Sequence, residues 1–253
     1  MNSNTPSTII NFIKETFVAQ NAPKAVVAVS GGIDSAVSLT LTARAISPEN
    51  VFAILMPYGN QDMTDATSVC EFNQIPSNQT VVLNIADSVE QLCSSLQVPT
   101  ADYLRRGNIM ARTRMIAVYD LAKQKQALVV GTENKSEFYL GYFTRFGDEA
   151  SDIEPISHLT KTQVRTLAAE LGLPQPILDK APSAGLWTGQ TDEKELGFTY
   201  QEVDSVINSL LTGKPTPPIV SDKTIDRIKK RIQSQSFKHH VPYRLEANPS
   251  LDF

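Results

Sequence analysis

Short apolar runs alternate with longer amphipathic stretches along this chain, and the alternation constrains its fold more strongly than any other feature of the sequence. The runs that predict strands cover residues 24–29, 51–56, 79–84 and 127–131. The stretches with helical spacing cover residues 33–46, 62–72, about 86 onward, 101–126, 160–171, 201–211 and 221–235. Strands that alternate with helices need crossover connections, which favour parallel pairing between two layers of helices. We therefore expect an α/β fold, a doubly wound parallel sheet with flanking helices.

The size and charge of the chain narrow its class. Its 253 residues suffice for one well-buried α/β domain, and we expect residues 1–253 to form a single domain. With 41% hydrophobic and 20% charged residues, the composition is that of a globular protein. The net charge of -4 leaves no excess of Lys and Arg to neutralise a phosphate backbone, which argues against a nucleic-acid partner.

Neither the start of the chain nor its cysteines and histidines indicate targeting or a zinc site. The first residues lack the basic region and apolar run of a signal peptide, and no run of about 18 apolar residues occurs, so we expect a cytoplasmic protein with no membrane partner. Cys70 and Cys93 match neither a CxxC pair nor a zinc site, and we interpret both as free thiols. His158, His239 and His240 form no metal-binding spacing with them.

The turn between the first expected strand and the first expected helix reads Ser-Gly-Gly-Ile-Asp-Ser at residues 30–35. Gly31 and Gly32 let backbone N–H groups approach a phosphate without a side-chain clash. The N-terminus of the following helix adds unsatisfied donors and a positive dipole. The hydroxyls of Ser30 and Ser35 can donate to the same oxygens. The turn is therefore predicted to bind the phosphates of a nucleotide.

The carboxylate of Asp34 is unusual in an anion site. It would repel a phosphate directly, so a cation between the two is implied, and Mg2+ is the cofactor that we expect. The alternative is a tight turn in which Asp34 and Ser35 only cap the helix. Walker-type NTPases and Rossmann dehydrogenases fit poorly, because the turn has neither a Walker lysine nor the GxGxxG spacing.

Several segments, in order along the chain, resemble one enzyme family. The loop at residues 30–35 resembles the SGGxDS loop of the ATP pyrophosphatase superfamily, whose fold is adenine nucleotide alpha hydrolase-like and whose members attack the α-phosphate of ATP. The NAD+ synthetase motifs GNI-x-AR-x-RM, GTxNxxE, GYFTxYGD, LTK, KxPTADL and QTDExELG are similar to residues 106–115, 131–137, 141–148, 159–161, 180–186 and 190–197. By this resemblance, which runs from about residue 26 to residue 204, the chain is identified as a member of the NAD+ synthetase family.

The resemblance implies a carbon–nitrogen ligase, the ammonia-dependent NAD+ synthase. ATP adenylates the carboxylate of nicotinic acid adenine dinucleotide, and ammonia then displaces AMP to complete the final step of NAD+ biosynthesis. Members that use glutamine carry a further amidase domain, for which we see no room, so we expect free ammonia as the nitrogen donor. The family pairs through its long helix, and we expect a homodimer that covers an apolar face through Ile109, Met110, Ile116 and Ala117.

The resemblance also assigns the catalytic residues. Glu137 becomes the second Mg2+ ligand, facing Asp34 across the crevice at the strand ends, and Mg2+ prefers such hard oxygen donors. Lys161 is expected to contact the ATP phosphates, since a cation at a helix start suggests an anionic partner. The alternatives are a first-turn acid for Glu137 and a solvated surface lysine for Lys161.

Two further positions match ATP contacts in the family. Thr132 can bind a phosphate oxygen or simply cap a helix. Ser183 stands where the family has Thr and keeps the hydroxyl, whereas Gly185 replaces an Asp. The complete set expected to bind ATP is Ser30, Gly31, Gly32, Asp34, Ser35, Thr132, Lys161 and Ser183.

The residues expected to bind the nicotinate-bearing substrate are Arg112, Arg114, Phe143 and Asp148. Arg112 and Arg114 are two residues apart on a helix, so only one can easily point into a given site, and a solvated helix face is the alternative for both. Asp148 matches a substrate-contacting position. Phe143, like Trp187, has packing as its alternative role.

Two rival functions remain, one from the same superfamily and one from another class. A tRNA-modifying thiolase of the same superfamily would carry a basic surface and often catalytic cysteines, whereas this chain is acidic with two isolated cysteines. A regulatory module would bind ATP without turning it over, and an activity assay distinguishes such a module from an enzyme. Residues 178–199 are predicted to form a long loop, a feature that is often functional.

Overall fold

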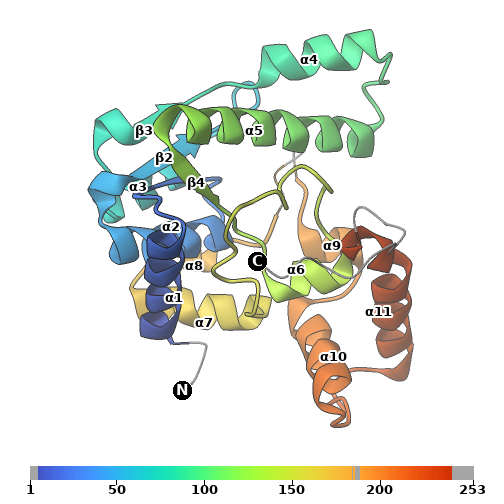
Figure 1. Cartoon of the computed structure of the whole chain (residues 1–253). Coiled ribbons are helices and arrows are strands. Elements are labelled where there is room, and N and C mark those ends of the chain that lie inside the picture. Colours follow the sequence, from blue (N-terminus) through green and yellow to red (C-terminus); the bar gives the residue numbers. More distant parts are fainter. Residues whose placement is uncertain (1–4, 184, 186–188, 241–253) are drawn as a thin grey trace, which may run out of the picture.

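Four parallel strands form the central sheet of the computed structural model, which describes residues 5–183, 185 and 189–240 (Figure 1). The strands are β1 (Lys24–Ala28), β2 (Val51–Leu55), β3 (Thr80–Val82) and β4 (Ala127–Val130). Their order across the sheet is β3-β2-β1-β4, so β1 is central, with Val26 opposite both Phe52 and Val129. The parallel sheet expected from the alternating pattern is confirmed.

Helices follow or precede every strand. They are α1 (Pro6–Ala19), α2 (Ile33–Ile46), α3 (Thr64–Phe72), α4 (Ala86–Ser95), α5 (Tyr103–Lys125), α6 (Lys135–Leu140), α7 (Lys161–Leu171), α8 (Gln175–Asp179), α9 (Asp192–Leu196), α10 (Tyr200–Thr212) and α11 (Asp222–Gln235). Short 3-10 segments occur at Pro48–Asn50, Ser77–Gln79 and Ser236–His239.

Alternate residues of the strands pack into two different hydrophobic clusters, one on each face of the sheet. Val27 of β1 lies in a cluster with side chains of α1, α2 and α7. Its neighbour Val26 lies in a second cluster with side chains of α4 and α5. Figure 1 shows α5 on one side of the strands and α1, α2 and α7 on the other. This period-two alternation confirms the doubly wound architecture.

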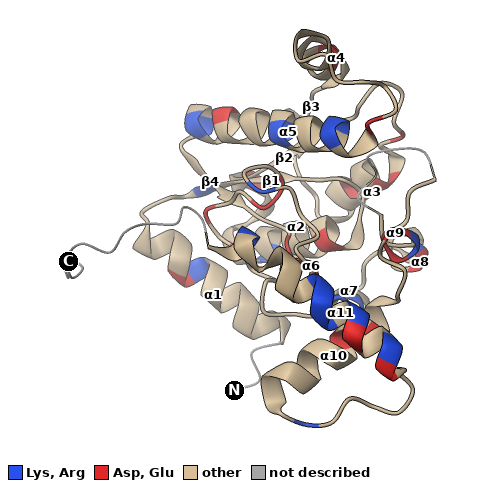
Figure 2. Cartoon of the chain, turned by 90° about the vertical axis from the view of Figure 1, so that its right-hand side faces the viewer, with Lys and Arg blue, Asp and Glu red and all other residues tan. Residues whose placement is uncertain are grey.

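A third hydrophobic cluster lies beside the sheet and joins α6, α9, α10 and α11. It contains Leu140, Val203, Ile207 and Ile228, each at most 1% exposed. Helix α11 turns Ile228 inward and carries charged residues of both signs along the rest of its surface (Figure 2). This cluster fixes the short helix α6 and the start of α10, both of which contribute to the candidate site.

Some expectations about elements need correction. The helix α1 was not predicted, and the stretch 178–199, predicted as a loop, contains α9 and the end of α8. Trp187 lies outside the described residues. The prediction of a single domain stays a prediction.

The apolar face predicted for α5 is also partly wrong. Met110 is 3% exposed and belongs to the cluster under α5, and Ile109 and Ala117 pack against the same cluster. Of the four residues only Ile116, at 61%, is largely exposed. Helical spacing places these residues on more than one face, so most of them serve the monomer core.

Two smaller expectations were tested by the structure. Cys70 and Cys93 are free and buried, as predicted, and burial raises the pKa of the Cys70 thiol to about 11. Among the described residues, no helix is both long and apolar enough to cross a membrane.

Candidate active site

The candidate site lies at the carboxyl ends of β1 and β4. The chain runs from β1 to β2 and β3 on one side and then crosses to β4 on the other side of β1. The connections after β1 and β4 therefore diverge, and such a switch point leaves a crevice where α/β proteins bind ligands. The loop of residues 29–32 enters this crevice from β1, and the loop of residues 131–134 enters it from β4.

The glycine turn packs closely against the start of α3. Gly31 has φ +76°, and a Cβ there would lie 2.9 Å from both Ala66 N and Asp65 Cβ, so glycine is required on both counts. Ser35 Oγ donates to the Gly32 carbonyl at 2.9 Å and lies 3.1 Å from Ser30 Oγ. The hydrogen bonds hold the turn in one conformation before any ligand binds.

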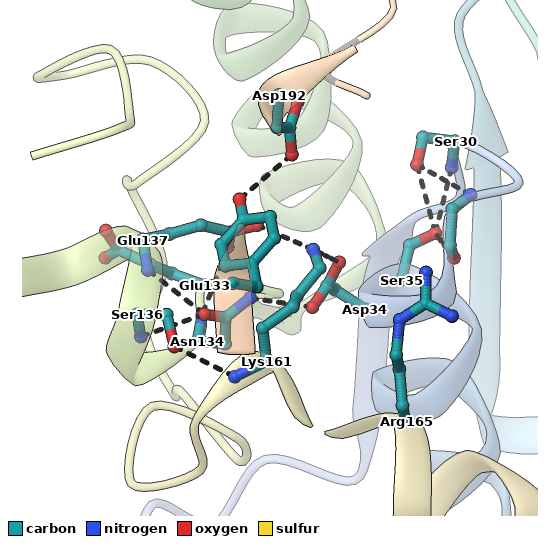
Figure 3. Close-up of polar contacts among 12 residues, drawn as sticks. Ser30, Asp34, Ser35, Glu133, Asn134, Ser136, Glu137, Lys161, Arg165 and Asp192 are labelled. Atoms are coloured by element: carbon teal, nitrogen blue, oxygen red, sulfur yellow. Dashed lines mark hydrogen bonds and ion pairs between the residues drawn. The ribbon is translucent and has the colours of Figure 1, made fainter. Parts of the chain in front are cut away.

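The interpretation of Asp34 and Ser35 as helix caps is wrong. The N-cap of α2 is Gly32, and no side-chain hydrogen bond caps this helix. Asp34 follows Ile33 in the first turn and directs its carboxylate away from the helix backbone, toward α7 (Figure 3). Its charge is therefore available to the crevice.

Lys161, Asp34 and Glu137 meet at one point between three helices. Lys161 Nζ donates to Asp34 Oδ2 at 2.6 Å and to Glu137 Oε1 at 2.9 Å (Figure 3). The lysine side chain is 3% exposed, and the two carboxylates are 16% and 17% exposed. The three residues predicted as the catalytic set are thus brought together, although Asp34 lies more than a hundred positions before the other two along the chain.

Neighbouring charges decide the ionisation of this lysine. Burial alone would lower the pKa of Lys161, but the attraction of Asp34 and Glu137 outweighs it and raises the pKa above its ordinary value. For the acid Glu137 the effect of burial has the opposite sign: burial raises its pKa, and the charge of Lys161 opposes that rise. The lysine is a fixed ammonium ion.

Asn134, which the sequence analysis did not single out, positions both carboxylates. It is the N-cap of α6, and its Oδ1 accepts hydrogen bonds from the backbone of Ser136 and Glu137 at 3.0 and 3.1 Å. Its Nδ2 donates to Asp34 Oδ1 at 2.8 Å. Glu137 completes the capping box, so the same side chain caps α6 and belongs to the site. Asn followed by Glu three residues later was the signal that could have revealed it.

Asp204 of α10 supports the cluster from behind. Its carboxylate accepts hydrogen bonds from the Thr162 amide at 2.9 Å, from Thr162 Oγ1 at 2.7 Å and from Ser136 Oγ. Ser136 Oγ in turn accepts the backbone N–H of Lys161 at 2.9 Å. A buried aspartate thus fixes the first turn of α7, the turn that carries Lys161. No local sequence signal marks Asp204.

Lys180 is a second residue that the sequence analysis left without a role. Its Nζ donates to the Gly31 carbonyl at 3.2 Å and to Asp65 Oδ2 at 2.5 Å. The segment that follows α8 is thereby tied to the glycine turn. The segment's match to the KxPTADL motif was the available signal.

Ser183 and Thr132 are the other two predicted ATP contacts outside the glycine turn, and within the ranges that the structure describes neither makes a contact like those of Lys161 with the two carboxylates. Ser183 Oγ donates to the Gln190 carbonyl at 2.8 Å and accepts the Gly185 amide at 3.1 Å, so it stabilises its own loop. Thr132 is half-buried in the loop after β4. It does not cap α6, because Asn134 does.

The predicted substrate residues come from α5, which carries Arg112 and Arg114, and from the loop after α6, which carries Phe143 and Asp148. Arg112 donates to the Arg145 carbonyl at 3.1 Å, whereas Arg114 donates to the Met56 carbonyl at 3.1 Å, so the two arginines point to different places as predicted. Asp148 Oδ1 accepts the Thr144 amide at 2.9 Å. Phe143 is buried against Phe138 and lies under Lys238 Nζ, which favours packing.

A hollow of about 950 Å³ opens beside this cluster, between α7, α10 and the segment after α8. Its walls include Lys161 of the cluster and Tyr200, whose ring centre lies 5.1 Å from Lys161 Nζ, together with Arg165 and Pro182. Among the described residues, neither the glycine turn nor Asp34 and Glu137 lines this hollow, so it is distinct from the predicted phosphate site.

Comparisons with known proteins place this geometry in a family. A family profile described as NAD synthase matches residues 6–242. The chain belongs to the NAD synthase family. An NH3-dependent NAD+ synthetase of Trichlorobacter lovleyi is 40% identical over 239 residues, which cover 92% of this chain and 87% of that protein. The resemblance stated from the sequence motifs is thereby confirmed.

Solved structures of the NAD synthase family share the fold. The NMN synthetase of Francisella tularensis has a TM-score of 0.84 and 37% identity, covering 95% of this chain and 97% of that chain. The NH3-dependent NAD synthetase of Campylobacter jejuni, in complex with a nitrate ion, has a TM-score of 0.80 and 30% identity, with the same coverage of 95% and 97%.

The NAD synthase site has a donor set that suits a divalent cation bound together with phosphates. Mg2+ takes one or two protein carboxylates and completes its shell with water and substrate phosphates. Asp34 and Glu137 supply two such carboxylates beside the glycine turn, while no group of three or more Asp, Glu, His or Cys side chains suited to a metal occurs in the described part of the chain. The two carboxylates could therefore hold Mg2+ together with the phosphates of a nucleotide.

Proposed function

We propose that this protein catalyses the ATP-dependent amidation of nicotinic acid adenine dinucleotide to NAD+ with ammonia, releasing AMP and pyrophosphate. The observation that carries the proposal is the buried cluster of Asp34, Glu137 and Lys161 beside the glycine turn, in a chain of the NAD synthase family. The cluster combines two potential metal ligands and one cation at the switch point of the sheet.

The chemistry explains why ATP is needed. A carboxylate is a poor electrophile because oxide would be its leaving group. One oxygen of the nicotinate carboxylate attacks the α-phosphorus of ATP, and the bond to pyrophosphate breaks. The nitrogen of ammonia then attacks the acyl carbon, AMP leaves, and the nitrogen loses a proton to give the amide. Both steps need alignment and charge neutralisation more than a protein nucleophile.

The residues of the cluster meet these needs. The backbone amides at the start of α2, which no side chain caps, receive phosphate oxygens. The Ser30 and Gly32 amides donate to the Ser35 and Ser30 hydroxyls, so these two hydroxyls face the same turn. Asp34 and Glu137 would hold Mg2+, which neutralises phosphate charge when bound. Lys161 supplies a further positive charge to the pyrophosphate that leaves. Thr132 and Ser183 are proposed as secondary ATP contacts.

The nicotinate-bearing substrate is proposed to bind on the α5 side of the cluster. Arg114 of α5, whose pKa is lowered by burial, donates to the Met56 carbonyl just after β2, and Arg112 of α5 donates to a carbonyl of the loop that also holds Asp148. A guanidinium pairs well with phosphate or carboxylate. Phe143 is proposed to keep this loop packed rather than to stack on a base.

A mononucleotide acceptor is the second candidate. The Francisella tularensis structure, at a TM-score of 0.84, is an NMN synthetase, and amidation of nicotinic acid mononucleotide uses the same carboxylate and the same chemistry. The two candidates differ only in whether an adenylate moiety must be bound.

One assay tests the function and separates the two acceptors. The purified protein is incubated with ATP, Mg2+ and ammonium, and with either the dinucleotide or the mononucleotide of nicotinic acid, while NAD+, NMN, AMP and pyrophosphate are quantified. We expect the dinucleotide to be amidated with the higher kcat/KM. A higher kcat/KM with the mononucleotide would select the second candidate. If no AMP forms with either acceptor, both candidates are rejected.

A further inference from the structure

The ammonium group of Lys161 occupies the place between the two carboxylates where a divalent cation would be bound. Its Nζ lies 2.6 Å from Asp34 Oδ2 and 2.9 Å from Glu137 Oε1, and it therefore bridges the two oxygens that face each other across the crevice. An ammonium ion and a metal ion cannot both take these oxygens. The two cations are alternatives for one site.

The lysine is well satisfied in this place. Besides its two hydrogen bonds, its Nζ lies 5.1 Å from the centre of the Tyr200 ring, a cation–π contact. The other oxygens of the two carboxylates are engaged by Asn134, through its Nδ2 to Asp34 Oδ1 and its backbone N–H to Glu137 Oε2. A metal ion that arrives alone must break the ion pairs of a buried lysine and leave that charge without a partner, which is strongly unfavourable.

We propose that Lys161 excludes the divalent cation from Asp34 and Glu137 until ATP binds, so that metal and nucleotide enter together. The phosphates of ATP give the displaced ammonium a new anionic partner, and the two carboxylates are released for the cation. Lys161 is suited to this exchange because only its side chain moves, while its backbone stays fixed by the hydrogen bond to Ser136 Oγ at 2.9 Å. The proposal rests on the proposed function in that ATP is the incoming nucleotide.

Binding of Mn2+ tests the exchange without any turnover. Electron paramagnetic resonance counts free Mn2+ during titrations of the wild type and of Lys161→Met, with and without α,β-methylene ATP. Without nucleotide, we expect Lys161→Met to bind Mn2+ at least about tenfold more tightly than the wild type, because removal of the ammonium frees the oxygens of Asp34 and Glu137 for the divalent cation. With nucleotide, the wild type is expected to bind Mn2+ well.

Two further variants locate the effect. Lys123→Met removes an exposed lysine from the last turn of α5, at a residue outside the site, and it should match the wild type. Adding Glu137→Gln to Lys161→Met removes one ligand and should abolish the gained Mn2+ binding.

The proposal is overturned when the wild type binds Mn2+ equally tightly with and without nucleotide, or when folded Lys161→Met gains no affinity. Restoration of folding of Lys161→Met by Mn2+ would support it, and if that variant does not fold at all, the two wild-type titrations decide. Because no nicotinate substrate is present, these results are independent of whether the protein makes NAD+.

Discussion

Lys161 begins α7, where the helix dipole disfavours a cation, and yet its side chain is only 3% exposed. The sequence argument that such a lysine needs an anionic partner holds, but in this structure the partners are the carboxylates of Asp34 and Glu137. At the scale of residues, the site is thus one ammonium group paired with two carboxylates, and the removal of any one of these charges takes an ion-pair partner from at least one of the others.

Removing either carboxylate charge tests the metal assignment. We expect Asp34→Asn and Glu137→Gln each to lower kcat by on the order of a hundredfold or more, because each loses a ligand for Mg2+ and a partner for Lys161. Steady-state kinetics measure the loss, and thermal unfolding checks that the variants are folded. Near-wild-type turnover in either variant would end the assignment.

Glu154 predicts a pH dependence of stability. Burial raises its pKa to about 7 from 4.5, although hydrogen bonds from Ser151 and the Glu133 backbone oppose the shift. Between these values the folded state binds more protons than the unfolded state, so the free energy of unfolding falls as pH rises from about 4.5 to about 7. Above that window this contribution is flat.

The variant Glu154→Gln lacks this contribution. Relative to the variant, the wild type should lose roughly 1 to 3 kcal/mol of unfolding free energy between pH 5 and pH 8. Urea unfolding at the two pH values measures the difference. The exposed Glu170→Gln serves as a control and should follow the wild type. If the unfolding free energies of the wild type and Glu154→Gln change in parallel with pH, the raised pKa of the Glu154 carboxyl is contradicted.

At the scale of elements, strands and long helices were predictable because their periodicity extends over enough residues. Helix α5 spans Tyr103–Lys125 against an expected 101–126, and β4 spans Ala127–Val130 against 127–131. The helices α6, α8 and α9 have only five or six residues, too few for a 3.6-residue pattern to be recognised.

Helix α1 is a different kind of omission. Its buried residues Ile9, Ile13 and Phe17 recur every four residues, and Thr5 and Pro6 give a cap and a first helical position. The sequence of this segment therefore carries a helical signal, although no helix was predicted there. Site residues were predictable where motifs matched, whereas Asp204 depends on tertiary packing alone.

Asp204 links three helices, and its substitution tests that link. In Asp204→Asn, one acceptor oxygen becomes an amide donor facing the donors of Thr162 and Ser136. We expect the free energy of unfolding to fall by about 1 to 3 kcal/mol and kcat to fall with it, because the first turn of α7 carries Lys161. Chemical unfolding and kinetics measure both.

A matched control separates this effect from a general loss of charge. Asp222 is likewise a helical aspartate, in α11, but it is exposed, so Asp222→Asn should change stability by no more than about 0.5 kcal/mol. Equal effects of the two substitutions would refute the proposed linking role of Asp204.

At the scale of the whole molecule, the surface formed by α4 and α5 carries several exposed apolar side chains. They are Leu92, Leu96, Tyr103, Leu104 and Ile116, each at least 43% exposed. Apolar exposure of this kind is typical of association surfaces, and the resemblance to a family that pairs through its long helix makes a homodimer our prediction.

Light scattering at micromolar concentration tests the homodimer. We expect twice the monomer mass for the wild type and a shift toward monomer for Ile116→Glu, which places a charge on the outer face of α5. Ile219→Glu, at a residue 80% exposed between α10 and α11, is the matched control and should leave the mass unchanged. A monomeric wild type with full activity would contradict the prediction.

The most direct test of the account follows the oxygen atoms of the substrate. Nicotinic acid adenine dinucleotide, labelled with 18O in both carboxylate oxygens, is converted with ATP, Mg2+ and ammonium chloride, and the products are examined by mass spectrometry. Adenylation of the carboxylate predicts one labelled oxygen in AMP and one in the amide of NAD+. AMP that carries no label, or NAD+ formed equally well from glutamine without free ammonia, would contradict the account.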